Sequence, residues 1–265
     1  MDFASVGGIL LALIGILGGL ILEGGSIAQV TQPTAMLIVL GGTVGATMLQ
    51  FPLDVFRTAL RQFMSVFLSR RINSEAVVAQ LVAFAEKARR GGILSLDPDL
   101  DLVQDPFLKQ ALMLAIDGTE PSAVRKIMQL ELDNKAEFEE RIPQVFESAG
   151  GFAPTVGIIG AVIGLIQVMQ RLDNIAEVGR GIATAFVATI YGVGLANLLF
   201  LPVAGKLRIR HQQEQLIQEM MLEGVISLQE GMNPRMIEIK LRTFLSEGNR
   251  DGAAGRRDET KDAAR

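Results

Sequence analysis

Residues 150–169 read GGFAPTVGIIGAVIGLIQVM, a stretch with no charged residue and five glycines. In water this pattern argues against a helix, because an interior glycine costs about 1 kcal/mol relative to alanine. In a bilayer it has another meaning, because lipid tails give helices no hydrophobic drive to associate and small residues let two backbones approach. At helical spacing the small residues form one stripe: Ala153, Gly157, Gly160, Ala161 and Gly164. The stretch predicts a membrane-spanning helix packed closely on a partner helix.

The chain contains four long apolar runs without charged residues, at 3–22, 34–53, 152–170 and 181–205. Each approaches or exceeds the roughly 20 residues that a helix needs to cross a hydrocarbon core of about 30 Å. Because 20% of the residues are charged, a large part of the chain must remain in water. The sequence therefore predicts an all-α protein with four transmembrane helices, a helical cytoplasmic domain inserted between spans two and three, and an amphipathic C-terminal tail.

These elements divide the chain into five expected parts. Residues 1–53 form the first pair of transmembrane helices, 54–151 the helical cytoplasmic domain, 152–205 the second pair, 206–247 the cytoplasmic C-terminal helices, and 248–265 a disordered tail. Within the cytoplasmic domain, Ser74 is the expected N-cap of one helix and Pro121 the start of a longer one.

Basic residues near the span ends predict the orientation. The loop 23–33 has no lysine or arginine, whereas basic residues follow the second and fourth runs: Arg57, Arg61, Arg70, Arg71, Lys206, Arg208 and Arg210. We therefore expect both termini and the domain 54–151 to lie in the cytoplasm.

Small residues also form stripes on other runs. On the first they are Gly8, Ala12, Gly15 and Gly19; on the fourth they are Gly181, Ala185, Ala188, Gly192 and Ala196. Such stripes pack helices either within one bundle or between subunits. Because four spans with such stripes exceed what one compact bundle requires, we expect an oligomer.

The apolar runs carry no ionisable side chain. Ion pathways through membranes usually need one facing the bundle interior, so an ion-conducting assembly would take its carboxylate from another chain. The hydroxyls that the third and fourth runs can contribute instead include those of Thr155, Thr184, Thr189 and Tyr191. A threonine in a spanning helix more often bonds its own backbone than lines a pathway.

Enzymatic chemistry has no support in the sequence. Without cysteine and with one histidine, His211, a metal or nucleophilic centre is disfavoured. The glycine-rich segments lack the G-x-x-x-x-G-K-[ST] pattern of a phosphate loop. A net charge of −4 gives no indication of nucleic-acid binding. We expect no catalytic activity and no cofactor.

Three segments together resemble one family. APTVGIIGAVIGLIQVM, GRGIATAFVATIYGVGLANLLFLPVAGKLRIR and EGVISLQEGMNPRMIEIKLRTFL are similar to the third span, the fourth span and the tail of the MotA/PomA subunit of bacterial flagellar stators, within the MotA/TolQ/ExbB superfamily. The resemblance covers about residues 1–247. It implies a pentamer of this chain in the bacterial inner membrane around two copies of a single-span MotB-like partner, whose aspartate carries the ion.

The resemblance also implies residue roles. Pro154 and Pro202 match prolines that couple ion passage to conformational change, and Arg89 and Asp97 match charged residues that face the rotor protein FliG, with Arg90 beside them. Asp97 departs from the family, which has glutamate there, so a shorter side chain weakens the expected contact. Thr189 is retained near the ion path, while Ala161 stands where sodium-driven relatives commonly have threonine, which favours protons.

Three functions remain open at this level. The first is a stator that couples ion flow to torque. The second is an ExbB/TolQ-like energiser of outer-membrane transport or integrity, a class that typically has three spans. The third is a structural four-span protein without ion coupling.

Overall fold

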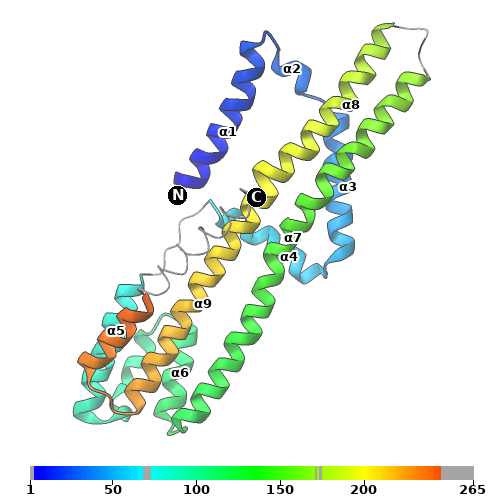
Figure 1. The fold of residues 1–265 in the computed structure, drawn as a ribbon. Coiled ribbons are helices and arrows are strands. Elements are labelled where there is room, and N and C mark those ends of the chain that lie inside the picture. The colour runs from blue at the N-terminus through cyan, green and yellow to red at the C-terminus, as the bar shows by residue number, and fades with distance from the viewer. Residues whose placement is uncertain (1–2, 68–72, 171, 173–174, 246–265) are drawn as a thin grey trace, which may run out of the picture. The chain divides into compact units, whose positions relative to one another are not determined.

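The computed structural model of the protein describes residues 3–67, 73–170, 172 and 175–245 (Figure 1). Across these ranges the regular secondary structure is entirely helical, so the all-α prediction is confirmed. The expected disordered tail, and Arg70 and Arg71 used for the orientation, lie outside the described residues.

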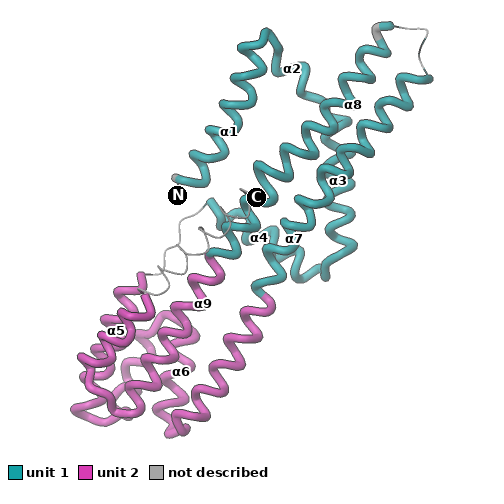
Figure 2. The backbone as a smooth tube through the Cα atoms, in the orientation of Figure 1, with its two compact units in different colours: residues 1–70, 139–209 teal, residues 71–138, 210–265 magenta. Residues whose placement is uncertain are grey.

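The chain forms two compact units, each built from two separated segments (Figure 2). The first unit is Met1–Arg70 with Glu139–Ile209, and the second is Arg71–Phe138 with Arg210–Arg265. The sequence placed the domain boundaries at 53/54 and 151/152, where the apolar runs end. In the structure, the unit that contains the spans extends further and includes residues 54–70 and 139–151.

Helices of the first unit include the membrane spans. Its elements are α1 (Phe3–Leu22), α2 (Ile27–Val30), α3 (Pro33–Gln50), α4 (Leu53–Ser65), part of α7 (Pro121–Met169), α8 (Ile175–Leu195), the π-helical η2 (Ala196–Phe200) and the start of α9 (Leu201–Gln229). Among the described residues four helical stretches are long and apolar enough to cross a membrane, at Ala4–Leu22, Ile27–Gln50, Pro121–Met169 and Glu177–Gln229. The four-span prediction is therefore confirmed.

The bounds of the spans differ from the apolar runs for local reasons. The second span ends at Gln50, because Phe51 and Pro52 adopt extended backbone conformations and α4 begins a new helix. The third span has no helical start of its own, since α7 runs unbroken for 49 residues and includes Pro143 and Pro154. A helix therefore extends well beyond the hydrophobic stretch that sequence pattern detects.

Two apolar clusters hold the first unit together. Val55, Ala59 and Val66 pack with residues of α7 and α9: Ile142, Val145, Phe146, Val203, Ala204 and Leu207. A second cluster joins α3 to α8 through Ala35, Val39, Val187 and Ala188. Beside it, the Tyr191 hydroxyl donates to the carbonyl of Val30 at 2.5 Å and accepts from the N–H of Gln32 at 3.0 Å. This hydroxyl fixes the connection between α2 and α3 onto α8.

The second unit contains α5 (Ser74–Gly91), the 3₁₀-helical η1 (Ile93–Leu102), α6 (Pro106–Ile116), the start of α7, the end of α9 and a helix at 234–245. The N-cap of α5 is Asn73, whose side chain accepts from the N–H of Ala76 at 3.3 Å, so the expectation of Ser74 was wrong by one residue. Pro121 begins α7 as predicted. The fully buried side chains of this unit come from all of these helices: Leu81, Leu96, Leu108, Leu112, Met128, Leu132, Met220, Met221, Ile226 and Ile237.

Candidate functional site

The third and fourth spans meet along a seam of small residues on α7 and α8. A Cβ built on Gly192 would lie 2.5 Å from the carbonyl oxygen of Ala153 and 3.1 Å from the Cα of Gly157. Because both neighbours are backbone atoms, the helices approach only where a side chain is absent. The six residues expected to pack helices all lie in this seam, within one chain: Gly157, Gly160, Gly164, Ala185, Ala188 and Gly192.

Threonine hydroxyls in and near the spans bond to their own helices. Thr155 donates to the carbonyl of Phe152 at 2.8 Å, Thr184 to Arg180 at 2.9 Å, and Thr189 to Ala185 at 3.4 Å. Thr189 is half-buried, as is Ala161 on α7. The apolar runs contain no ionisable side chain, so the threonines alone cannot exchange a proton at physiological pH.

The two prolines expected to couple ion flow to motion lie near one contact between α7 and α9. Pro154 has no N–H for the carbonyl of Gly150, four residues earlier. A Cβ built on that glycine would lie 2.8 Å from Cδ2 of Leu201, which directly precedes Pro202. The backbone that Pro154 weakens at Gly150 therefore lies against the side chain of Leu201, the residue before Pro202.

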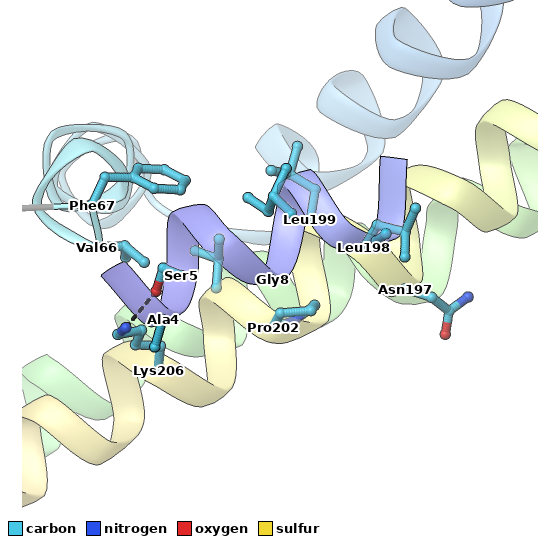
Figure 3. Close-up of a pocket in the computed structure, with 13 residues that line it drawn as sticks. Ala4, Ser5, Gly8, Val66, Phe67, Asn197, Leu198, Leu199, Pro202 and Lys206 are labelled. Carbon is cyan, nitrogen blue, oxygen red and sulfur yellow. Dashed lines mark hydrogen bonds between the residues drawn. The ribbon is translucent and has the colours of Figure 1, made fainter. Parts of the chain in front are cut away.

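A π-helical turn precedes Pro202. The N–H of Leu201 bonds to the carbonyl of Ala196, five residues back, instead of four. Such bulges often occur at functional sites and bend a helix. Pro202 also lines a cavity of about 270 Å³ with Gly8 of α1 and Lys206, whose ammonium group donates to the hydroxyl of Ser5 (Figure 3). Sequence reasoning found Pro202 but gave no signal for the bulge.

The three residues expected to contact a rotor lie at one turn of the second unit. Arg89 and Arg90 are in the last turn of α5 and Asp97 is in η1, so none of them is on an irregular loop. Gly92 joins the two helices at φ 77°, a conformation that favours glycine. All three side chains are exposed, and none forms an ion pair with a described residue.

Neighbouring ion pairs hold this turn in place. Lys87 of α5 pairs with Asp99 of η1 at 2.6 Å, and Lys109 of α6 pairs with Asp101 at 3.2 Å. The ion pairs that stabilise this turn are therefore formed by charged residues close to Arg89, Arg90 and Asp97, and these three side chains remain exposed to solvent. Exposure without an ion pair therefore separates Arg89, Arg90 and Asp97 from the paired charges beside them.

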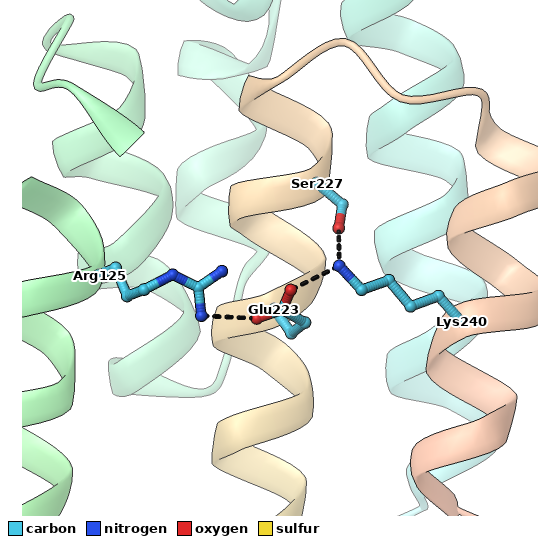
Figure 4. A network of polar contacts seen from close by, with 4 residues as sticks. All are labelled: Arg125, Glu223, Ser227 and Lys240. Atoms are coloured by element: carbon cyan, nitrogen blue, oxygen red, sulfur yellow. Dashed lines mark hydrogen bonds and ion pairs between the residues drawn. The ribbon is translucent and has the colours of Figure 1, made fainter. Parts of the chain in front are cut away.

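A partly buried polar network, which sequence reasoning did not identify, ties three helices of the second unit together (Figure 4). Glu223 of α9 accepts from Arg125 of α7 at 2.8 Å and from Lys240 of the helix at 234–245 at 2.5 Å. Lys240 also donates to the fully buried Ser227 at 3.1 Å. The hydrogen bond from Arg125 and that from Lys240 lower the pKa of Glu223, against the opposing effect of burial.

Neutralising Glu223 is expected to loosen the helix at 234–245. A carboxylate whose pKa is lowered in the folded state stabilises that state above its ordinary pKa, here 4.5, and loses this effect as the pH falls. Glu223→Gln should cost about 1 kcal/mol at neutral pH, since Arg125 and Lys240 are partly exposed. The loosening should appear as faster amide hydrogen exchange at residues 234–245 in Glu223→Gln than in wild type at the same pH.

The control for this substitution is Glu219→Gln on the same helix, because Glu219 accepts a hydrogen bond only from Gln215 in the described network. The difference between Glu223→Gln and wild type should shrink at pH 4. Equal exchange in both variants at neutral pH would contradict a stabilising role for the network.

Comparison with known proteins extends over nearly the whole chain. The family model described as motility protein A N-terminal matches residues 6–92, and that of the MotA/TolQ/ExbB proton channel family matches 99–220. Motility protein A of Bacillus subtilis (strain 168) is 36% identical over 246 residues, covering 92% of this chain and 91% of the relative. Chemotaxis protein PomA of Vibrio alginolyticus is 31% identical, covering 91% and 97%.

Solved structures agree with these relatives. The flagellar MotAB stator complex from Bacillus subtilis contains a chain that is 35% identical, with a TM-score of 0.86 and coverage of 96% of this chain and 100% of that one. The C. jejuni MotAB structure gives 32% identity, a TM-score of 0.88 and coverage of 92% and 96%.

The fold and the site define a multi-pass membrane subunit whose spans pack through glycine and alanine and carry no ionisable group. The family model, the curated relative and the solved structure that match this chain are a proton channel family, a motility protein and a flagellar stator complex, so the chain is a channel or stator subunit and not an enzyme. The chain belongs to the motility protein A family.

Proposed function

We propose that the chain is a stator subunit of a bacterial flagellar motor, which couples ion flow across the inner membrane to torque on the rotor. The observation that carries this function is the combination of four spans free of ionisable residues with a fold that matches stator chains over more than nine-tenths of their length. The energy comes from moving charge across the membrane, at about 2.3 kcal/mol per charge per 100 mV.

The partner in this proposal is a single-span MotB-like chain. The similar solved structures are MotAB complexes. Because this chain supplies no carboxylate in its spans, the ion-carrying aspartate must come from the partner. We further propose a pentamer of this chain around two partner copies. The open space around the glycines of α1, including Gly8, Gly15 and Gly19, leaves that helix available for contacts outside the chain.

Within the pentamer, Pro154 and Pro202 would transmit the ion step. Their support is the contact between Gly150 and Leu201 together with the π-helical turn at Ala196–Phe200, since a bulge lets a helix change its bend without unfolding. Thr189 and Ala161 would face the ion path. The methyl group of Ala161 offers no ligand to sodium, which prefers oxygen, so we propose protons as the driving ion.

Arg89, Arg90 and Asp97 would face the rotor protein FliG from the cytoplasm. Their exposure and lack of ion pairs within the described chain support this role. The proposal places residues 54–151 and 206–247, and both termini, on the cytoplasmic side of the spans at 1–53 and 152–205.

An ExbB/TolQ-like energiser is the alternative in the same superfamily. Proteins of that class typically have three spans, whereas this chain has four helices able to cross a membrane within its described residues. Relatives over nine-tenths of the chain include motility protein A and chemotaxis protein PomA. The stator function is therefore preferred.

Ion conduction provides the direct test. Liposomes containing this chain alone should show no proton flux above empty vesicles, because the spans lack an ionisable group. Liposomes containing the chain with its MotB-like partner should conduct, and replacing the partner's span aspartate with asparagine should abolish conduction. Flux through the chain alone would overturn the division of roles between the two chains.

Topology provides an independent test. Alkaline phosphatase, which is active only outside the cytoplasm, should be inactive when fused near residues 100 and 240 and active when fused near residues 28 and 176. This pattern is expected because the basic residues follow the second and fourth spans. Alkaline phosphatase activity at residue 100 would contradict the proposed orientation.

A further inference from the structure

Helix α4 has an apolar face that the first unit buries. Val55 and Ala59, with Val66 just after the helix, are no more than 2% exposed and pack against α7 and α9. Phe63 stacks on Phe146 of α7 with ring centroids 5.9 Å apart. One side of α4 is therefore fully used by the fold of the chain itself.

The opposite side of α4 is exposed yet still largely apolar. Leu53, Leu60 and Met64 are 51%, 62% and 65% exposed. At 100° per residue these three lie on one stripe with Arg57 and Arg61, in a sector of about 100° directly across the helix from Val55 and Ala59. A surface helix of a soluble protein usually carries charged and polar residues on the face opposite its buried one.

The two arginines on this stripe have no acidic partner among the described residues. They stand four residues apart, so their guanidinium groups project one turn from each other along the same side. The only acidic residue of α4 is Asp54, in its first turn, where it stabilises the positive end of the helix dipole. The stripe therefore carries two uncompensated positive charges among exposed apolar side chains.

The position of α4 in the chain explains this pattern. The span α3 ends at Gln50, Phe51 and Pro52 are extended, and α4 starts at Leu53 in a new direction (Figure 1). Only two residues separate it from the hydrocarbon-spanning helix, so α4 must lie at the level where the bilayer meets water. Under the proposed orientation, on which this step rests, that surface is the cytoplasmic one.

We propose that this stripe binds anionic phospholipids of the cytoplasmic leaflet, with Arg57 and Arg61 on lipid phosphates and Leu53, Leu60 and Met64 among the upper acyl carbons. A bilayer surface supplies both chemistries at the depth where α4 lies. The same stripe on the α4 of a second copy has no acidic residue, so two such stripes cannot neutralise each other. An anionic phospholipid therefore complements both the positive charge of the arginines, through its phosphate, and the apolar side chains of the stripe, through its acyl chains.

A single tryptophan can report this contact, because the chain has none of its own. Leu60→Trp in the assembled complex with the partner should be quenched by lipids brominated on shallow acyl positions. Leu130→Trp is the matched control, since Leu130 is also 62% exposed but lies on α7 in the second unit. It should not be quenched. The complex with the wild-type chain gives the background from the partner, and gel filtration verifies assembly of each variant.

Lipid charge separates binding from simple proximity. Quenching of Leu60→Trp should be stronger with brominated phosphatidylglycerol than with brominated phosphatidylcholine at equal mole fraction. Arg57→Gln with Arg61→Gln should remove this preference, which we expect to be up to about fivefold per arginine, since each basic side chain contributes about 1 kcal/mol at an anionic surface. Arg89→Gln with Arg90→Gln should leave it unchanged.

Two results would overturn the proposal. If no brominated lipid quenches Leu60→Trp, another protein surface covers the stripe. If both lipids quench equally in the wild-type background, Arg57 and Arg61 give no preference for anionic phospholipid. Because quenching requires neither ion flow nor a rotor, these failures are distinct from a failure of the stator function, which the flux experiment detects.

Discussion

Gly192→Ala is expected to reduce the recovery of folded complex strongly, whereas Gly194→Ala on the same helix should be tolerated. The new methyl group at residue 192 would lie 2.5 Å from the carbonyl oxygen of Ala153 and 3.1 Å from the Cα of Gly157. Neither backbone atom can rotate away, so α7 and α8 must separate. At Gly194 nothing lies within 4 Å of the added carbon.

The effect at Gly192 extends beyond one contact. Separating the helices also weakens the packing of Gly160 and Gly164 against Ala188 and Ala185, where built Cβ atoms already lie 3.0 and 3.2 Å from their neighbours. Forcing extra atoms into a packed interface typically costs about 1–3 kcal/mol, a large part of the stability of a folded unit.

The measurement is the amount of complex recovered by gel filtration after detergent extraction, with the thermal midpoint of the surviving fraction. Wild type and Gly194→Ala should give equal amounts of complex with equal thermal midpoints. Gly192→Ala should give much less complex, with a lower thermal midpoint. Equal recovery of the two alanine variants would mean that the seam tolerates a wider helix separation and that its glycines serve another purpose.

The spans were predictable because the bilayer imposes a length and a composition that the sequence must satisfy. The glycine stripe likewise indicated close packing, and the structure provides its partner in α8. What the stripe on α1 packs against was not predictable: a Cβ built on any of its glycines meets no atom of another helix within 4 Å. A small residue indicates close approach, but the identity of the approaching helix depends on tertiary and quaternary structure.

Other features of the structure could not be predicted from sequence patterns. The continuity of α7 through residues 139–151 depends on packing of Ile142, Val145 and Phe146 against α4, because hydropathy changes along that stretch while helicity does not. The π-helical turn before Pro202 differs from an α-helix by one hydrogen bond. Arg125, Glu223 and Lys240 are distant in sequence, so only the fold brings them together.

Reversing two charges, Arg89→Glu with Arg90→Glu, is expected to stop swimming without affecting assembly or ion conduction. Both side chains are exposed in the last turn of α5 and pair with no described residue, so their reversal breaks no ion pair and costs the fold only their interaction with the helix dipole, about 0.3–1 kcal/mol each. Losing either charge alone should impair swimming only partly, because the other remains within the screening length of about 8 Å at physiological salt. Reversal of both turns attraction toward acidic rotor residues into repulsion.

The control must change net charge equally. Lys126→Glu with Arg235→Glu does so at exposed positions elsewhere in the second unit, and should leave swimming largely intact. The decisive experiment expresses the Arg89/Arg90 reversal in cells whose rotor protein carries the complementary reversal from acidic to basic residues. Recovered swimming there requires that the two surfaces meet directly, since a general loss of stator stability could not be repaired by changing a different protein. Persistent immobility together with lost assembly would instead mean that Arg89 and Arg90 maintain the second unit, and that the rotor is contacted through other residues.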